Sequence, residues 1–502
     1  MDRPWRGRAA GQERRHRRGD RRRRDRHQGR PGLHRRRRQS GAADQAAIPG
    51  SRRRPSRRPR LVGLGPRDAA PGAARFQKTR PRGLPRQIRG GLRRTCSQQT
   101  TKCDIVTDIL VEGGRILLGD EFADAALRIA GRDIHAVGAD HGHSAVTIDA
   151  RGLLVLPGIV DLHGDAFERQ MMPRPGVDFP IDVALVDSDR QAIANGITTV
   201  FHAATWSWEP GLRSGDNARR LLEAIEGLRP QLAADTRFHL RHETYNLDAE
   251  AEIGEWLSEG RIDLFAFNDH MDATVGDLAK PQKRNRMVER TGLSGAAFDD
   301  LVQRIVARAH DVPASIERLA TAARAAGVKM LSHDDDSPQM RKAFRVQGVA
   351  IAEFPVNEAT AREAADGGDF IVFGAPNVVR GGSHTGWTRA SDMIAKGLCS
   401  ILASDYYYPA QLLAAFRLAV DGILPLAQAW QLISAAPAQA AGLADRGKLA
   451  AGHRADIILV DDKVPLRPRI VAVIAAGRLV HLTEAGRLMQ TAPTSRRAVA
   501  AA

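Results

Sequence analysis

The chain alternates eight times between a short apolar run, typical of a buried strand, and a longer stretch with helical periodicity. The runs are "LVLPGIVDLHGD", "ITTVFHA", "RFHLRHE", "DLFAFNDH", "VKMLSHDDD", "VAIAEFPV", "DFIVFGAPN" and "SILASDYY". Helical stretches such as "NARRLLEAIEGLRPQL" and "SIERLATAARAAG" separate most of them. Eight such units in about 270 residues predict an α/β fold of the (β/α)8 TIM-like barrel type. A doubly wound open sheet is the alternative, but no glycine-rich phosphate loop follows the first run.

Segments with a different residue pattern precede and follow this barrel in the chain. Residues 103–140 and "GKLAAGHRADIILVDDKVPLRPRIVAVIAAGRLVHL" contain brief apolar runs punctuated by glycine and aspartate, which indicate short strands and turns. We therefore predict one small β-sandwich domain built from residues 104–156 and 447–482, around a barrel at residues 157–446.

The N-terminal segment, residues 1–103, differs from everything after it. The first hundred residues contain 31 arginines and 1 lysine against 6 acidic residues, so a chain of net charge +17 has an acidic body of −9. Such a segment buries too little apolar surface to fold, and we predict that it is disordered. Its arginine-rich composition also fits a start assigned too early, with the fold beginning near residue 104. Dense arginine can bind nucleic acid, so an arginine-tailed nucleic-acid-binding protein on an inactive barrel is one hypothesis.

Cysteine usage and hydropathy indicate the compartment. Cys96, Cys103 and Cys399 form neither a disulfide framework nor a zinc motif, which fits a reducing cytoplasm. The sequence has no apolar stretch of about 18 residues and no secretory signal pattern. We predict a cytoplasmic protein without a membrane partner.

Histidine and carboxylate residues end several of the predicted strands, which is where barrels of this type carry their reactive groups. These residues are His163, Asp165, Glu243, His270, His333 and Asp405. Three imidazoles and three carboxylates suit one or two divalent ions, with zinc favoured and manganese or iron as alternatives. Such an ion would activate a water molecule as a nucleophile. Taken alone, His163 and Asp165 would equally suit an ordinary ion pair.

Strand alternation also predicts which neighbours of these residues face elsewhere. His242 precedes Glu243 and should face away from the barrel axis. Asp334 should point away from the side that His333 and Asp335 share.

These features together resemble the amidohydrolase superfamily, in which a β-sandwich of both termini packs beside a metal-bearing barrel. The resemblance covers residues 104–482 and rests on "LPGIVDLHGD", the spaced histidines, "ASD" and "GKLAAGHRADIILVD". The chain departs from the superfamily pattern twice. The common His-x-His motif is His163-Gly164-Asp165 here, and the bridging carboxylated lysine has no obvious counterpart, for which Glu243 is the natural substitute.

Longer motifs are similar to those of the PhnM family of the carbon–phosphorus lyase pathway: "HGDAFERQ", "NDH", "SHDD", "GAPNVVRGGSHTG" and "ASDYYYP". This resemblance implies a diphosphatase that hydrolyses α-D-ribose 1-methylphosphonate 5-triphosphate to the 5-phosphate and pyrophosphate during phosphonate catabolism. Other enzymes of that pathway would act upstream and downstream. The resemblance further implies that Asp405 orients the attacking water and takes its proton. Hydrolysis of a cyclic amide, or deamination of a ring, is the alternative.

A triphosphate substrate requires cations besides the metal, and two motifs offer candidates for phosphate binding. They are Arg380, Ser383 and His384 in "VVRGGSHTG", and Lys280, Lys283, Arg284 and Arg286 in "KPQKRNRM". Glycine amides in the first motif can approach an oxyanion, and arginine binds phosphate in a bidentate manner. The second motif would equally suit a solvated helix face. A small phosphorylated substrate is therefore the predicted partner; the intact ligand set argues against nucleic acid, and the sequence indicates no oligomeric state.

Overall fold

The computed structural model describes residues 108–138, 144–174, 176–383, 386 and 388–490. The arginine-rich segment at 1–103 and the candidate ligand His384 lie outside the described residues. Within these ranges, no helix combines the length and apolar character needed to cross a bilayer.

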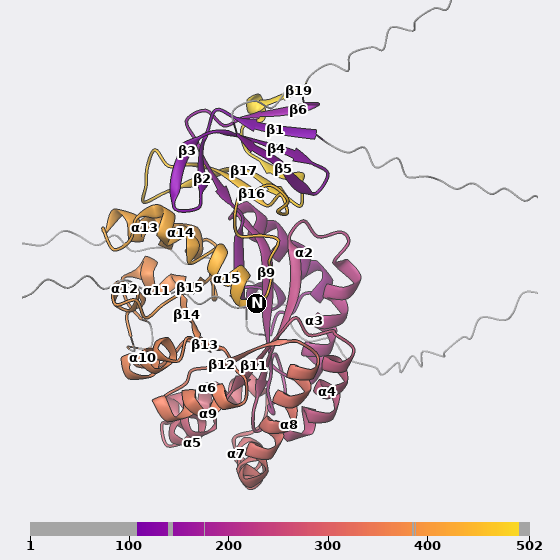
Figure 1. The fold of residues 1–502 in the computed structure, drawn as a ribbon. Helices are drawn as coiled ribbons and strands as arrows, with labels where there is room; N and C mark the ends of the chain where they lie inside the picture. The colour runs from indigo at the N-terminus through magenta and orange to yellow at the C-terminus, as the bar shows by residue number, and fades with distance from the viewer. Residues whose placement is uncertain (1–107, 139–143, 175, 384–385, 387, 491–502) are drawn as a thin grey trace, which may run out of the picture. The chain divides into compact units, whose positions relative to one another are not determined.

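Eight parallel strands form the centre of the fold and are hydrogen-bonded in chain order (Figure 1). The last strand returns to the first, because Asp405 N donates to His163 O at 2.9 Å and Asp165 N donates to Asp405 O at 3.2 Å. This nearly closed barrel confirms the predicted (β/α)8 architecture, and the open sheet is wrong. The strands are β8 (Ile159–Gly164), β9 (Ile197–Trp206), β10 (Asp235–Glu243), β11 (Leu264–Asn268), β12 (Lys329–His333), β13 (Ile351–Glu353), β14 (Phe370–Gly374) and β15 (Ile401–Ala403).

Side chains alternate between two apolar layers along these strands. Leu264, Leu331 and Val372 belong to a cluster inside the barrel, whereas Phe265 and Met330 pack outward against helices. Helices α2, α3, α4 and α8 follow one another along one flank of the strands in Figure 1. The helices that connect or follow the strands are α1 (Glu168–Met171), α2 (Ile181–Ala194), α3 (Gly215–Leu228), α4 (Glu250–Ser258), α8 (Val312–Ala325), α9 (Pro338–Val346), α10 (Glu358–Asp366), α11 (Ala375–Arg380), α12 (Ala390–Ala395), α13 (Ala410–Val420), α14 (Leu426–Gln431) and α15 (Ala435–Ala440).

Two further sheets contain segments from both ends of the described chain. One has the strand order β19-β6-β1-β4-β5 and the other β18-β17-β16-β7-β2-β3. Ile109 and Ile129 of the first sheet share a buried cluster with Val155 and Leu459 of the second, as expected for the predicted β-sandwich. The strands are β1 (Asp108–Glu112), β2 (Arg115–Leu118), β3 (Glu121–Asp124), β4 (Ala126–Ala130), β5 (Asp133–Gly138), β6 (Val146–Asp149), β7 (Leu154–Pro157), β16 (Ile457–Asp461), β17 (Arg469–Ala475), β18 (Arg478–Leu482) and β19 (Leu488–Gln490).

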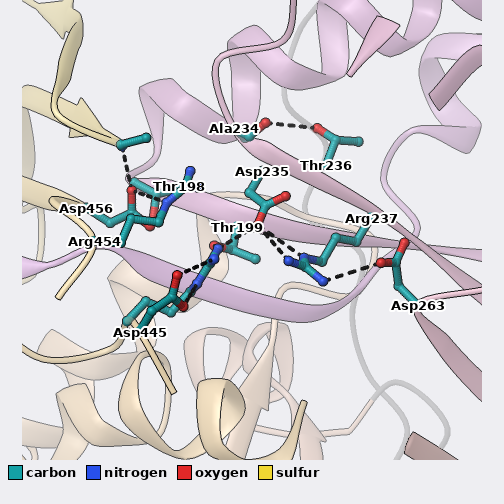
Figure 2. Close-up of polar contacts among 12 residues, drawn as sticks. Thr198, Thr199, Ala234, Asp235, Thr236, Arg237, Asp263, Asp445, Arg454 and Asp456 are labelled. Atoms are coloured by element: carbon teal, nitrogen blue, oxygen red, sulfur yellow. Dashed lines mark hydrogen bonds and ion pairs between the residues drawn. The ribbon is translucent and has the colours of Figure 1, made fainter. Parts of the chain in front are cut away.

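A network of ion pairs occupies the N-terminal ends of β9 and β10. Figure 2 shows Asp235 facing Arg237, whose guanidinium also faces Asp263. Arg446 joins the same network by donating to Asp235 Oδ2 at 2.6 Å and to Thr199 Oγ1 at 2.8 Å. In barrels of this class the N-terminal end contributes stability and the opposite end carries chemistry.

A helical excursion, residues 271–311, separates β11 from α8. It contains α5 (Met271–Leu278), α6 (Pro281–Thr291) and α7 (Gly295–Val306). Pro281 starts α6 because proline presets the helical φ, and Gly292 ends it with a φ of 68°, a conformation that favours glycine. Ser294 then caps α7. The excursion has its own small core, formed by Met271, Phe298, Val302 and Ile305, against which Trp208 and Met287 pack.

Candidate metal centre

The structure gathers the predicted metal ligands at the C-terminal ends of the barrel strands, in two groups. Within each group, one ligand atom per residue lies within 4.8 Å of the others. Glu243 stands beside the second group, with its Oε1 2.8 Å from Nδ1 of His270. The rings of His163 and His333 lie 5.5 Å apart between centroids, so the groups are adjacent. The first group is His163, Asp165 and Asp405, and the second is His270, His333 and Asp334.

Asp334 belongs to this centre although strand alternation placed it outside, and that prediction was wrong. Strand β12 ends at His333, and Asp334 has a φ of 60°. Its carboxylate thereby turns to His270 Nε2 at 3.1 Å and His333 Nδ1 at 3.3 Å. Asp335 points the other way and pairs with the buried Arg341 at 3.2 Å. The alternation rule applies only while the backbone is extended, and the extended backbone of β12 ends at His333, one residue before Asp334.

Three residues with left-handed backbone conformations surround the centre. Asp334, Phe354 and Asp405 have φ values of 60°, 56° and 56°, and each follows the end of a barrel strand. All three border the same cavity. A residue other than glycine in this region costs about 1–3 kcal/mol, and such strain concentrates at functional sites.

Two buried residues near His163 were missed by the sequence reasoning. Glu353 Oε1 lies 2.8 Å from Nδ1 of His163, and His239 completes a third group of ligand atoms within 4.8 Å of one another. Glu353 Oε2 and His239 Nε2 are buried and have no hydrogen-bond partner in the described part of the chain. Both carried a signal: Glu353 is the one charged residue of "VAIAEFPV", and His239 shares the strand face of Glu243.

An arginine stands between the two ligand groups and was also missed. Arg241 donates from Nη2 to His333 Nε2 at 3.0 Å, and its Nη1 lies 3.7 Å from Asp165 Oδ2. A second arginine, Arg213, lies on the loop after β9, and its Nε is 3.9 Å from Oε1 of Glu168 in α1. The centre therefore holds fixed positive charge beside its carboxylates, which suits an anionic ligand.

Carboxylates control the proton affinity of the histidines in this centre. Burial opposes a charge on His163, but Glu353 raises its pKa to about 10. Burial acts in the same way on His270, and Glu243 raises its pKa to about 10. Burial and a neighbouring carboxylate raise the pKa of Asp405 to about 6. The negative potential that favours protons on these imidazoles would equally favour a divalent cation in their place.

The donor set fits a divalent ion on chemical grounds. Imidazole nitrogens and carboxylate oxygens in groups of three are the ligands that zinc, manganese and iron share. The buried Glu353 Oε2 and His239 Nε2, which have no hydrogen-bond partner among the described residues, are further donor atoms. Buried polar atoms of this kind require an explanation, and a cation provides one.

Two hollows flank the centre. The first, which we call the β14 hollow, has a volume of about 220 Å³ and borders both His163 and His333. It also contains the predicted phosphate ligands Arg380 and Ser383, and Arg380 Nη1 donates to the Tyr406 hydroxyl at 3.3 Å. The second, the α6 hollow, has a volume of about 340 Å³ and borders Glu243, His270, Lys283 and Arg286.

Lys280 and Arg284, the other predicted phosphate ligands, border neither hollow. Lys280 Nζ lies 2.8 Å from Asp277, and Arg284 Nη2 lies 2.6 Å from Asp299 of α7. Their charges are thus engaged within the helical excursion.

The contact between Glu353 and His163 yields a first prediction. Replacing Glu353 by glutamine should weaken divalent metal binding about 10- to 100-fold, because the glutamate fixes the ring and raises its basicity. Metal content after dialysis against graded free metal measures this. The same substitution at Glu358, which is exposed and pairs with Arg362, should leave the metal content unchanged. Equal retention in both variants would contradict the role of Glu353.

Two matches with known sequences extend over most of the chain. The amidohydrolase family profile matches residues 154–489. The α-D-ribose 1-methylphosphonate 5-triphosphate diphosphatase of Escherichia coli (strain K12) is 31% identical over 362 residues, which is 71% of this chain and 96% of that protein. The adenine deaminase of Gluconobacter oxydans (strain 621H) is 50% identical over only 60 residues, 12% of this chain and 10% of that protein.

Solved structures with the same fold are more distant in sequence. The dihydropyrimidinase from Brevibacillus agri NCHU1002 superposes with a TM-score of 0.53 at 14% identity, over 75% of this chain and 95% of that one. A D-hydantoinase superposes with a TM-score of 0.51 at 14% identity and the same coverage. At this level of identity, the likeness supports the fold alone.

Proposed function

Because the chain belongs to the amidohydrolase family and to its PhnM branch, we propose that it hydrolyses α-D-ribose 1-methylphosphonate 5-triphosphate to the 5-phosphate and pyrophosphate. The observation that carries the proposal is the combination of two adjacent histidine–carboxylate groups with fixed arginines beside them. The ligand groups suit a metal-dependent hydrolase, and Arg241 and Arg380 suit an anionic substrate. A neutral cyclic amide offers no negative charge for these arginines to bind.

The chain's own residues can be given roles in this reaction. A divalent ion, with zinc favoured and manganese or iron as alternatives, would lower the pKa of water and polarise the phosphoryl oxygens. Asp405, fixed by its backbone bonds to β8, would take a proton from the attacking water on a carboxylate oxygen. The water oxygen forms a bond to the α-phosphorus, the bond to the bridging oxygen breaks, and pyrophosphate leaves with that oxygen.

Arginines would stabilise the negative charge on the phosphoryl oxygens and on the leaving pyrophosphate in this step. Arg241 is buried next to the ligand groups, so its attraction for phosphoryl oxygens would be only weakly screened by solvent. Arg380 and Ser383 would bind an anionic part of the substrate in the β14 hollow. In a reaction sequence, one enzyme would supply the triphosphate and another would consume the 5-phosphate.

Product analysis with and without metal tests the proposal. The full chain with stoichiometric metal should release pyrophosphate and the 5-phosphate in equal amounts. Chelation should abolish the release, and returning the metal should restore it, because the ion would lower the pKa of the attacking water. Protein that holds metal, ignores the triphosphate and opens a neutral cyclic amide would overturn the proposal in favour of the alternative chemistry.

A further inference from the structure

The α6 hollow contains more positive side chains than a metal centre requires. Lys283, Arg286 and Arg290 border it, and their spacing along α6 places them on one face of the helix. The hollow also borders Glu243 and His270, so this cationic face looks onto the second ligand group. A ligand held there would touch both the helix and the metal centre.

Arg213 connects the two hollows, because it borders both of them. The second ligand group spans both spaces, because His333 and Asp334 border the β14 hollow and His270 borders the α6 hollow. The spaces differ in chemistry. The rings of Phe354 and Phe373 border the β14 hollow, whereas the α6 face contributes three cations to the other.

The three cations of α6 differ in how firmly they are held. Lys283 Nζ lies 2.7 Å from Asp277, and Arg290 Nη2 lies 2.8 Å from Glu209. Arg286 has no hydrogen-bond or ion-pair partner among the residues that the structure describes. Asp277 and Glu209 border the same hollow, so Arg286 is the cation of α6 whose charge no carboxylate of the described residues engages there. A guanidinium of this kind can bind a phosphate in a bidentate manner.

The helix that carries these cations is anchored rather than loosely attached. Met287, one residue after Arg286, packs on the small core of the excursion together with Trp208. Rigid placement reduces the entropy lost when a ligand orders the side chains.

We propose that the α6 hollow is a polyanion subsite that takes the two terminal phosphates of the substrate and then holds pyrophosphate before its release. The sugar and its phosphonate would occupy the β14 hollow, against Phe354 and Arg380. This assignment rests on the proposed function, because it presumes a triphosphate substrate.

Binding of inorganic pyrophosphate to the metal-loaded full chain, measured by calorimetry, tests the subsite without catalysis. Arg286→Gln should weaken pyrophosphate binding about ten-fold, the loss expected for one charge-assisted contact. It should leave binding of the 5-phosphate product within about two-fold. Arg308→Gln is the matched control, since Arg308 follows α7 and pairs with Asp248 away from the hollow. Metal content is determined for each variant, because pyrophosphate chelates metals.

The outcomes separate the subsite from the reaction. A parent protein that fails to hydrolyse the triphosphate, but whose pyrophosphate affinity falls in Arg286→Gln, would support the subsite and contradict the proposed substrate. Unchanged pyrophosphate affinity in Arg286→Gln would overturn the subsite even in an active enzyme. A ten-fold loss in Arg380→Gln instead would show that pyrophosphate binds in the β14 hollow, which also overturns it.

Discussion

Replacing Asp405 by asparagine is expected to lower kcat for pyrophosphate release about 10³-fold or more. The carboxylate lies at the junction of β15 and β8, in one group with His163 and Asp165. The amide of asparagine has the same shape but cannot take a proton from water, so the loss falls on the chemical step. Initial rates of pyrophosphate formation at saturating substrate measure the effect.

Two controls make this result specific. Asp421→Asn, which alters an exposed carboxylate paired with Arg417, should keep the parent rate. Metal content of Asp405→Asn must be determined, since Asp405 is also a candidate ligand. A variant that retains its metal and more than a tenth of the parent kcat would restrict Asp405 to a ligand role.

Replacing Arg341 by methionine is expected to lower the free energy of unfolding by about 3–5 kcal/mol. The guanidinium is fully buried and donates to Ser332 Oγ and to the Val349 carbonyl, each at 2.6 Å. It also pairs with the buried carboxylates of Asp335 and Asp369, each at 3.2 Å. Methionine fills similar space but leaves the buried Asp335 without its cation, and that desolvated charge is the main cost. Asp369 keeps its ion pair with Arg345 at 2.7 Å. Urea unfolding followed by circular dichroism measures the change.

A matched arginine on the surface separates this effect from loss of charge in general. Arg362→Met removes an exposed pair with Glu358 and should change stability by less than about 1 kcal/mol. Arg341→Lys keeps the charge without the planar fork and should fall between the two. Equal unfolding midpoints for Arg341→Met and Arg362→Met would contradict the account of the buried network.

The sequence predicted the barrel because parallel strands buried on both faces leave a direct trace, an apolar run such as "ITTVFHA" in β9. Strand-end positions then brought His163, Asp165, His270, His333 and Asp405 to one end of the barrel, and the structure places them together. The β-sandwich followed from the short runs at both ends of the core chain.

The remaining features depend on conformation that composition does not encode. The predicted orientation of Asp334 was wrong because no local sequence pattern indicates a left-handed residue directly after a strand. Among the candidate phosphate ligands of the excursion, periodicity could not show that Lys283 and Arg286 border the hollow while Lys280 and Arg284 do not. The phase of a helix about its axis is set by packing, here by Met287 against the small core.

The left-handed residues at the barrel mouth serve the function of the protein at a cost to its stability. Glycine or asparagine would adopt the backbone of Asp334 or Asp405 with less strain. Either substitution is therefore expected to raise the melting temperature while it removes a carboxylate from the metal centre. Laboratory evolution for heat resistance, run without a screen for activity, would therefore accumulate changes at these positions. The residues that such a selection discards first are the ones on which the chemistry depends.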